Sequence, residues 1–466
     1  MSEKFQTVVI GGGPAGYVCA IRLAQLGLKT ACIDSRASLG GTCLNVGCIP
    51  SKSLLNLTEE FHKVKNLSNK GIEVGNVKLN LGKMMQSKDK AVTVLTKGVE
   101  FLLKKNKVTY FKGTGSFKSR NEISIKDHQN NEITIQSEKI VIATGSVAVS
   151  LPGIEIDEKI IVSSTGALKL EKVPKKMIVV GGGYIGLEMG SVWSRLGAEV
   201  HIIEFLDHIS PGMDKEISQE FMKILKKQGI HFHMQNKVET IKKNASGAIV
   251  TTTDNEGNKN QHECDIVLIS VGRKPNIEGL NIEKIGIMLD EKKRIKINRN
   301  FKTNVDNIYA IGDVIEGPML AHKAEDEAIA VAENIVGQSG HVNYNTIPSV
   351  IYTKPEVACI GQTEEQLKQL NQKYKVGKFS FMANSRAKAI DETEGFVKIL
   401  ADETTDKVLG AQIIGPHAGE LISEIGIAME FGASSEDIAR TCHAHPTFSE
   451  AVKEAALAVD KRAIHS

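Results

Sequence analysis

The chain has 466 residues, 41% of them hydrophobic, and a formal net charge of +3. This length predicts about three domains. The nearly balanced charge gives no reason to expect a nucleic-acid or membrane-surface partner, and no apolar run reaches the roughly 18 residues that span a bilayer. The start of the chain leads directly into an apolar run, Phe5–Ile10. We therefore expect no signal or transit segment and a cytoplasmic protein, or else a trimmed organellar form.

One pattern occurs twice in the sequence, with an offset of 170 residues. The first copy consists of an apolar run, a glycine-rich segment at 11–16, a helical stretch and a second apolar run that ends at Asp34. The second copy has its glycine-rich segment at 181–186, and its second apolar run ends at Glu204. Because several landmarks keep one offset, the sequence predicts two copies of a single βαβ unit.

Both glycine-rich segments read Gly-x-Gly-x-x-Gly, with an acidic residue 18 positions after the third glycine. The first glycine permits a tight turn, the second lets the backbone approach a pyrophosphate, and the third allows close helix–strand packing, while the acid binds a ribose. We predict two dinucleotide sites; a structural turn without ligand is the alternative. No arginine follows Glu204 closely, which favours NAD over NADP at the second site. The predicted contacts are Gly11, Gly13, Pro14, Ala15, Gly16 and Asp34 at the first site, and Gly181, Gly183, Tyr184, Ile185, Gly186 and Glu204 at the second.

The later elements complete the predicted architecture. Strand-like runs at 139–145 and 265–272 close the two halves, and a third run at 307–313 precedes a helical stretch, 322–336. From residue 348 onward the sequence has short strands and amphipathic helices, the clearest at 411–414, 420–431 and 449–459. The pattern predicts an α/β protein with two Rossmann-like dinucleotide-binding domains and an α+β C-terminal domain.

The chain has seven cysteines, and two of them stand apart. An odd number in a long chain argues against a framework of structural disulfides, and Cys19, Cys32 and Cys264 lie in apolar segments typical of buried thiols. Cys43 and Cys48 instead lie among glycines and a proline. Their Cys-x4-Cys spacing does not match the Cys-x2-Cys pairs of zinc sites.

The spacing of this pair constrains the backbone between the cysteines. Residues five apart on an ideal helix have Cα atoms about 8–9 Å apart, whereas a disulfide needs roughly 7 Å or less. A disulfide therefore requires a break in the helix, which Gly47 permits, and Pro50 suits the first turn of the helix that follows. Cys48 would then lie at a positive helix end that lowers its pKa, which favours dithiol–disulfide exchange. Two unrelated thiols are the alternative.

Segment 40–52 resembles the active site of the flavin-dependent pyridine-nucleotide–disulfide oxidoreductases, and the resemblance covers essentially the whole chain. Segments 181–197, 319–326 and 442–450 most resemble the family members that oxidise dihydrolipoyl groups. The resemblance implies FAD at the first fingerprint, NAD at the second, and a homodimer. It implies an FAD-binding domain at 1–147, an NAD-binding domain at 148–273, a central domain at 274–346 and a dimer-interface domain at 347–466.

The same resemblance assigns roles to individual residues. Cys48 is expected to face the flavin, and Cys43 to exchange with the substrate disulfide. A thiol relay needs an acid/base near neutral pH; the motif places it at His445, oriented by Glu450 and supplied by the other subunit, rather than at His443. Lys52 is expected near the flavin, paired with Glu188, with a solvent-exposed lysine as the alternative. Further implied contacts are Gly41, Thr42, Gly115, Ala143, Thr144, Gly145, Ser146, Asp313, Met319, Leu320, Ala321 and His322 for FAD, and Val238 and Gly272 for NAD.

The implied reaction is oxidation of protein-bound dihydrolipoyl groups to the disulfide, with electrons passing through the cysteine pair and FAD to NAD⁺. The implied partners are the lipoyl-carrying subunits of 2-oxo-acid dehydrogenase or glycine-cleavage complexes. Two alternatives stay open: an NAD(P)H-dependent reductase of another small disulfide such as glutathione disulfide, whose enzymes share a tyrosine at position 184, and a non-catalytic assembly subunit. The His443-x-His445 pair lacks further ligand clusters, so no metal site is predicted.

Overall fold

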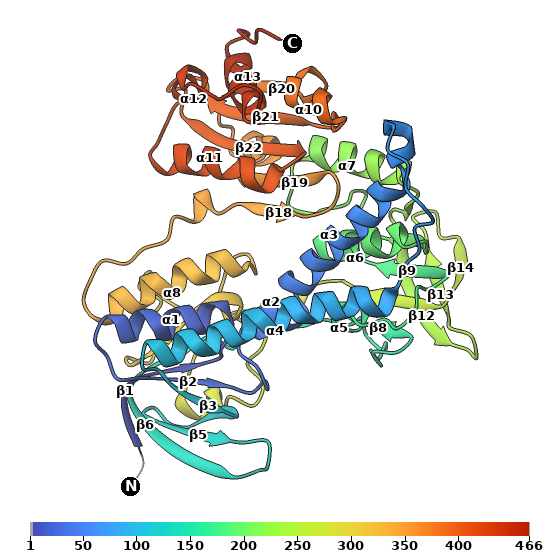
Figure 1. Cartoon of the computed structure of the whole chain (residues 1–466). Coiled ribbons are helices and arrows are strands. Elements are labelled where there is room, and N and C mark those ends of the chain that lie inside the picture. Colours follow the sequence, from blue (N-terminus) through green and yellow to red (C-terminus); the bar gives the residue numbers. More distant parts are fainter. Residues whose placement is uncertain (1–2, 466) are drawn as a thin grey trace. The chain divides into compact units, whose positions relative to one another are not determined.

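The computed structural model describes residues 3–465, which form two compact units (Figure 1). Unit 1 contains the residues up to Leu54, Asn80–Val149 and Gly272–Val342; unit 2 contains Leu55–Leu79, Ser150–Val271 and the residues from Asn343 onward. Over this described range no helix combines the length and the apolarity that crossing a membrane requires. The finer division into four domains stays a prediction.

Unit 1 is built on a parallel sheet with an antiparallel extension. The sheet has the order β3-β2-β1-β6-β5-β4, and β17 also pairs with β6. Its parallel part comprises β1 (Glu3–Ile10), β2 (Thr30–Asp34), β3 (Thr109–Lys112), β6 (Glu132–Ile142) and β17 (Ile308–Ala310). The antiparallel extension is β4 (Thr114–Ser119) and β5 (Glu122–Lys126), and a separate ribbon pairs β7 (Ser146–Ala148) with β16 (Arg273–Pro275).

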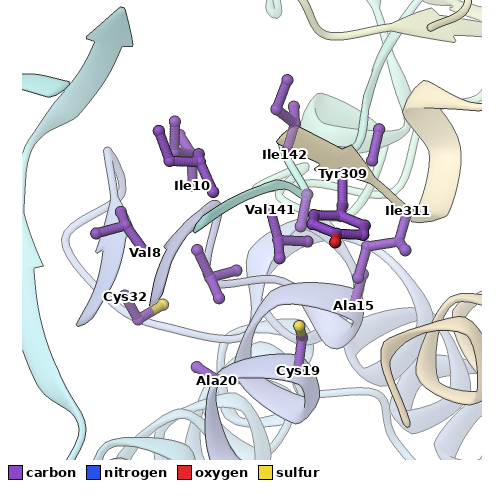
Figure 2. Close-up of a cluster of buried hydrophobic side chains, with 14 of the residues drawn as sticks. Val8, Ile10, Ala15, Cys19, Ala20, Cys32, Val141, Ile142, Tyr309 and Ile311 are labelled. Carbon is purple, nitrogen blue, oxygen red and sulfur yellow. The ribbon is translucent and has the colours of Figure 1, made fainter. Parts of the chain in front are cut away.

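Three long helices cover this sheet: α1 (Pro14–Gln25), α4 (Leu81–Lys105) and α8 (Ala321–Ile335). The shorter elements of unit 1 are α2 (Gly41–Val46), the start of α3 (Cys48–Lys65), η2 (Ile282–Ile285) and η3 (Gly312–Val314). Apolar side chains of β1, β6, α1 and the β17 region form one core (Figure 2). Cys19 and Cys32 lie in it, and burial raises the pKa of both thiols, which confirms the prediction of buried structural cysteines.

Unit 2 contains the second copy of the βαβ pattern: β9 (Lys176–Val180), α6 (Tyr184–Arg195) and β10 (Glu199–Ile203). In the first copy Ile10 pairs with Ile33, and in the second Val180 pairs with Ile203. Each residue of the second pair lies 170 positions after its counterpart in the first. The predicted duplication is therefore confirmed down to the register of the strands.

Around β9 and β10 the five parallel strands have the order β11-β10-β9-β15-β8. The other elements of this region are α3 beyond Leu55, η1 (Leu67–Lys70), β8 (Ile161–Val162), α5 (Ser164–Ala167), α7 (Lys215–Lys227), β11 (His231–His233) and β15 (Ile266–Ile269). A separate antiparallel sheet is formed by β12 (Lys237–Lys243), β13 (Ala248–Thr253) and β14 (Lys259–Cys264).

The C-terminal part of unit 2 is an antiparallel sheet with the order β18-β19-β22-β21-β20. Its strands are β18 (Ser349–Ile351), β19 (Glu356–Gly361), β20 (Tyr374–Ser380), β21 (Phe396–Asp402) and β22 (Val408–Gly415). Its helices are η4 (Tyr344–Thr346), α9 (Glu364–Gln369), η5 (Phe381–Ala383), α10 (Ser385–Ile390), α11 (Ala418–Glu430), α12 (Ser435–Arg440) and α13 (Glu450–Val459). The strand and the two helices predicted for this region correspond to β22, α11 and α13, which confirms its α+β character.

Four histidines gather where the parallel sheet of unit 2 meets β14. His201 Nδ1 lies 2.9 Å from His233 Nε2, the ring of His231 stacks on His201, and His262 packs edge-on against His233. Burial, followed by the neighbouring imidazoles and Lys176, lowers the pKa of His233 to about 4. Burial likewise lowers the pKa values of His201 and His262. His233 therefore stays neutral in the folded chain at a pH at which free histidine is already protonated.

This cluster predicts a loss of stability in acid. Because the unfolded chain binds a proton on His233 near pH 6.5 and the folded chain only near pH 4, stability is complete above pH 6.5 and falls between these values. We expect a loss on the order of 1–2 kcal/mol, reduced by partial exposure of the ring. Denaturant unfolding at a series of pH values measures it. His233→Phe should flatten the profile, and the exposed-loop variant His128→Gln should not; an unchanged slope in His233→Phe would contradict the explanation.

Candidate active site

The first glycine fingerprint forms a turn with no room for side chains at two of its three glycines. Gly11 has φ +113°, and a Cβ there would lie 2.2 Å from the carbonyl oxygen of Ala143. A Cβ on Gly16 would lie 1.7 Å from the oxygen of Gly11. On Gly13 it would meet nothing closer than Gly41 Cα, at 3.7 Å. The turn is thus closed by its outer glycines and open at the middle one, as a pyrophosphate requires.

The second fingerprint repeats this geometry. Gly181 has φ +106°, and a Cβ on it would lie 2.6 Å from the oxygen of Ser270. A Cβ on Gly186 would lie 2.2 Å from the oxygen of Gly181, whereas one on Gly183 would meet no atom within 4 Å. Both turns lead into long helices, α1 and α6, whose N-terminal N–H groups suit an anion. The residues present therefore fit two dinucleotides.

The acidic residue of each copy also has a role that the sequence did not reveal. Asp34 accepts hydrogen bonds from Gly12 N at 2.5 Å and Arg36 N at 2.7 Å. Glu204 accepts them from Gly182 N at 2.6 Å and Leu206 N at 2.8 Å. Each buried carboxylate thus fixes its own glycine turn. Binding of a ribose by the same oxygens stays a prediction, which their spare acceptor capacity allows.

Several predicted flavin contacts converge on the first fingerprint. Gly41 has φ +56°, and a Cβ on it would lie 2.6 Å from Gly13 Cα, so this segment lies directly over the turn. Thr42 Oγ1 accepts a hydrogen bond from Arg36. The Cβ position of Gly115 lies 3.3 Å from Ile10 Cγ2, so β4 crosses close to the end of β1.

The remaining flavin candidates of the β6–β7 turn are held by residues that the sequence reasoning missed. Ser146 Oγ donates to Asp313 Oδ2 at 2.5 Å, and Arg273 Nε donates to the same hydroxyl at 2.7 Å. Thr144 Oγ1 donates to the oxygen of Asn276 at 2.6 Å. Arg273 and Asn276 had no motif of their own. Only the structure shows that the β7–β16 ribbon brings them to this turn.

A buried ion pair lies behind the Gly312–Val314 turn that carries Asp313. Lys323 and Glu327 are one helical turn apart on α8, fully buried, and 3.0 Å apart. Gly312 N donates to Glu327 Oε2 at 2.8 Å, and Lys323 Nζ donates to the oxygen of Gly312 at 3.2 Å. The pair therefore clamps both backbone groups of Gly312. At the N-terminal end of the same helix lie Met319, the N-cap Leu320, Ala321 and His322, and their contact with the flavin stays a prediction.

The cysteine segment shows the predicted break in the helix. Helix α2 ends at Val46 and α3 begins at Cys48, while Gly47 between them has φ −140° and ψ −117°. Pro50 lies in the first turn of α3. A Cβ on Gly47 would lie 2.8 Å from the oxygen of Thr42 and 3.1 Å from Cys43 Cα. Close packing of the backbone, rather than a positive φ, therefore requires glycine here.

Both cysteines of the pair are free thiols in the structure. The Cys43 thiol shares a hydrogen bond with Cys48. This hydrogen bond, burial and the charges of Cys48 and Glu325 raise the pKa of Cys43 far above its usual range. Since dithiol and disulfide are the two states of an exchanging pair, the geometry brings the two sulfurs together as predicted. Because its pKa is raised, the Cys43 thiol needs a base to lose its proton.

Gly47→Ala tests the role of the break. The added methyl group would overlap the Thr42 carbonyl, so the segment must shift by several tenths of an ångström. Because misplacement of reacting groups is costly, we expect turnover to fall by about 10- to 100-fold, with FAD content unchanged. Gly75→Ala is the matched control, because its Cβ would meet no atom within 4 Å. Full activity of Gly47→Ala would show that the close packing at the break is dispensable.

The candidate base has the predicted orienting partner. His445 Nδ1 lies 2.8 Å from Glu450 Oε1, and Thr447 N donates to Glu450 Oε2 at 2.8 Å. Burial would raise the pKa of Glu450, but these two hydrogen bonds outweigh it and hold that pKa below its usual range. The His445 side chain is 68% exposed. His443 instead binds the oxygen of Thr441, which suits a structural role.

The other predicted residues lie on separate elements. Lys52 lies on α3 in unit 1 and Glu188 on α6 in unit 2, so their pairing stays a prediction. Glu188 is buried and accepts a hydrogen bond from Tyr352 N at 3.1 Å. Tyr184 and Ile185 begin α6, and Tyr184 is 42% exposed. Val238 lies on β12, and Gly272 has φ +122°. Among residues 3–465 no group of three or more side chains is arranged to hold a metal ion.

Two regions of the chain match the profiles of one family. Residues 5–328 match the pyridine nucleotide-disulphide oxidoreductases, and residues 347–456 match the dimerisation domain of that family. The chain is 54% identical over 466 residues to the mitochondrial dihydrolipoyl dehydrogenase of Pisum sativum. The match covers 100% of this chain and 93% of the relative. It is 56% identical over 461 residues to the dihydrolipoamide dehydrogenase of Chaetomium thermophilum. This match covers 98% of this chain and 92% of the relative. It is 55% identical over 459 residues to the leghemoglobin reductase of Vigna unguiculata, and this match covers 98% of this chain and 88% of the relative.

Solved structures agree on the fold. The HOCl-induced flavoprotein disulfide reductase RclA of Escherichia coli, solved as a Cu(II) complex, matches with a TM-score of 0.87 at 27% identity over 97% of this chain and 99% of that one. LpdA of Mycobacterium tuberculosis has the same fold, with a TM-score of 0.89 at 24% identity and the same coverage. FAD and NAD(H) are thus the cofactors of this chain, and its dimerisation domain makes it a homodimer. The chain belongs to the pyridine nucleotide-disulphide oxidoreductase family.

Proposed function

We propose that this protein is a dihydrolipoyl dehydrogenase, which oxidises protein-bound dihydrolipoyl groups to the lipoyl disulfide and reduces NAD⁺. The observation that carries this assignment is the identity of about 55% to such enzymes along the whole chain. The hydrogen-bonded thiols of Cys43 on α2 and Cys48 at the start of α3 support it. The same relatives do not favour the alternative reductase of glutathione disulfide.

In the proposed reaction the base and the two cysteines handle one disulfide exchange. His445, held by Glu450, takes a proton from a dihydrolipoyl thiol. The resulting thiolate attacks Cys43 Sγ of the oxidised pair and releases Cys48 as a thiolate. The second substrate thiol then attacks the mixed disulfide, which frees Cys43 and completes the lipoyl disulfide. Bound FAD supplies the path by which the electron pair leaves Cys48 for NAD⁺.

Residues of the chain stabilise the thiolate and bind the two cofactors in these steps. Cys48 lies at the positive end of α3, which stabilises its thiolate. The proposed flavin contacts are the first fingerprint, Gly41, Thr42, Lys52, Gly115, 143–146, Asp313 and 319–322; the proposed nucleotide contacts are the second fingerprint, Glu188, Val238 and Gly272. His445 and Cys43 belong to different units of the chain. We propose that the base serves the cysteines of the partner subunit in the dimer.

A direct assay tests the proposal. The purified protein should produce NADH from dihydrolipoamide and NAD⁺, and His445→Gln should lower the rate by about 10²- to 10⁴-fold, as expected for loss of a general base. His443→Gln should retain most of it. Turnover of glutathione disulfide with NADPH, together with none of dihydrolipoamide, would overturn the assignment.

The partners and the compartment follow from the same proposal. Lipoyl groups reach the site on carrier subunits of 2-oxo-acid dehydrogenase or glycine-cleavage complexes. The relatives from Pisum sativum, Arabidopsis thaliana and Dictyostelium discoideum are mitochondrial. They favour an organellar matrix and give no support to the cytoplasm expected from the sequence.

A further inference from the structure

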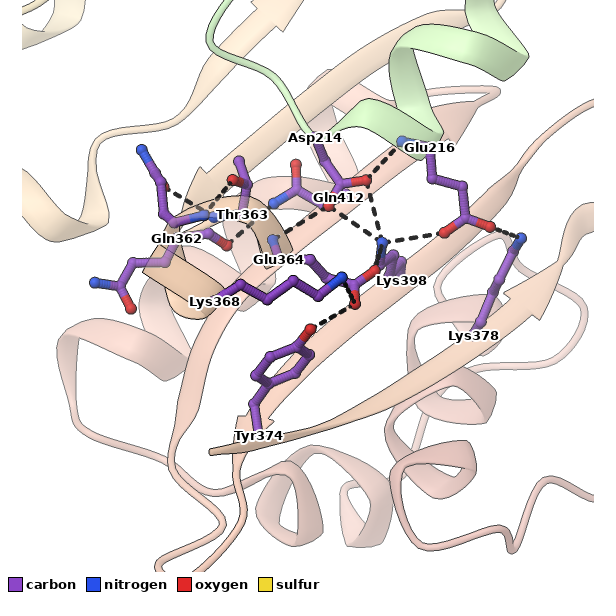
Figure 3. Close-up of polar contacts among 11 residues, drawn as sticks. Asp214, Glu216, Gln362, Thr363, Glu364, Lys368, Tyr374, Lys378, Lys398 and Gln412 are labelled. Carbon is purple, nitrogen blue, oxygen red and sulfur yellow. Dashed lines mark hydrogen bonds and ion pairs between the residues drawn. The ribbon is translucent and has the colours of Figure 1, made fainter. Parts of the chain in front are cut away.

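A fully buried lysine of the dimerisation domain binds the start of α7 in the nucleotide-binding part of unit 2 (Figure 3). Lys398 Nζ, on β21, lies 3.1 Å from each carboxylate oxygen of Asp214, which is also buried. The same ammonium group donates to Glu216 Oε2 at 3.0 Å and to Glu364 Oε2 at 2.5 Å. Three carboxylates thus use all three of its N–H groups.

Two of the three carboxylates also bind a second side chain through their other oxygen. Tyr374 Oη donates to Glu364 Oε1 at 2.8 Å, and Lys378 Nζ donates to Glu216 Oε1 at 2.5 Å. Burial opposes the charge of Lys398, but the carboxylates outweigh it and raise its pKa above the ordinary range. The buried ammonium group of Lys398 fixes the geometry of the carboxylates around it, because removing it would leave the buried charge of Asp214 unpaired.

Asp214 passes this restraint to the glycine turn of the second fingerprint. It is the N-cap of α7 and ends the segment that begins after Glu204. Within this segment Ser210 N donates to the oxygen of Gly182 at 2.8 Å. Gly182 N in turn donates to Glu204 at 2.6 Å. An unbroken series of hydrogen bonds and short backbone links therefore joins Lys398 to the peptide between the first two fingerprint glycines.

We propose that Lys398 is a positioning residue for NAD: through Asp214 it holds segment 205–214, and with it the Gly182 turn and Glu204, in the geometry that binds the dinucleotide. The proposal rests on the assignment of NAD to the second fingerprint. It gives the dimerisation domain an influence on the nucleotide half of the reaction without any contact with the nucleotide. The thiol half of the reaction does not depend on this network.

The test separates the two half-reactions. Lys398→Met should raise the KM for NAD⁺ by about tenfold, because small displacements of a binding turn are costly. Anaerobic reduction of the bound flavin by dihydrolipoamide should stay within about twofold of the parent protein, since this step needs no NAD⁺. Asp214→Asn retains an effective helix cap but removes the charge, so it should raise the same KM by less. Lys378→Met, which removes the exposed partner of Glu216, should leave it unchanged.

Each other outcome has a definite meaning. Equal increases in KM for NAD⁺ and for dihydrolipoamide would reveal a general loosening of the fold and overturn the proposal, as would an unchanged KM for NAD⁺. If Lys398→Met does not fold, Asp214→Asn and Glu364→Gln decide the question. In each of them the change in KM for NAD⁺ is compared with the change in KM for dihydrolipoamide. Gly183→Val serves as the reference for the site itself. If it leaves NAD⁺ binding intact, the assignment of NAD to this fingerprint fails, independently of Lys398.

Discussion

Cys43→Ser should abolish the dihydrolipoamide-dependent formation of NADH, with a loss of at least about 10³-fold, because serine cannot form the mixed disulfide. FAD should remain bound, since Cys43 lies beside the flavin fingerprint in unit 1 without forming its turn. NADH should still reduce the bound flavin. Stopped-flow measurement of each half-reaction would show which of them is lost.

The second cysteine makes this prediction specific. Cys48→Ser should also stop turnover, but it should in addition remove the long-wavelength absorption of the reduced enzyme, which requires a thiolate beside the flavin. Cys43→Ser should retain that absorption. Cys442→Ser, at an exposed position in the loop between α12 and α13, should change neither property. If both active-site variants lost the absorption equally, the division of labour between Cys43 and Cys48 would be wrong.

Much of this architecture could be predicted because it follows from local rules. The two βαβ units were visible as repeated glycines and acids at one offset, and the structure keeps that offset in its strand register. The break between α2 and α3 followed from the reach of a disulfide compared with the rise of a helix. The pairing of His445 with Glu450 could be predicted because the partners are only five residues apart.

Contacts between distant residues could not be predicted. Arg273 reaches Ser146, and Lys398 reaches Asp214, across more than 100 residues of sequence. Nothing in a single sequence marks such partners, and charged residues are usually exposed. Lys323 and Glu327 show the problem at short range. Their i, i+4 spacing is typical of a surface ion pair, yet the helix turns both side chains into the core.

This buried pair leads to the expectation that Lys323→Met destabilises the protein by about 3–5 kcal/mol, the usual cost of leaving one buried charge unpaired. Because Glu327 and Lys323 bind the two backbone groups of Gly312, the neighbouring Asp313 should move as well. FAD should therefore dissociate faster. Denaturant unfolding of the apoprotein and fluorescence of released flavin measure the two effects separately.

Two comparisons isolate the physical cause. The double variant Lys323→Met with Glu327→Gln removes both charges and keeps an amide oxygen that can accept from Gly312 N, so it should recover much of the lost stability. Lys302→Met breaks a pair of the same i, i+4 spacing, Lys302–Asp306, whose acid is fully exposed. It should cost less than about 1 kcal/mol. Equal losses in Lys323→Met and Lys302→Met would mean that burial does not govern this pair, and unchanged flavin release would separate the pair from the Asp313 turn.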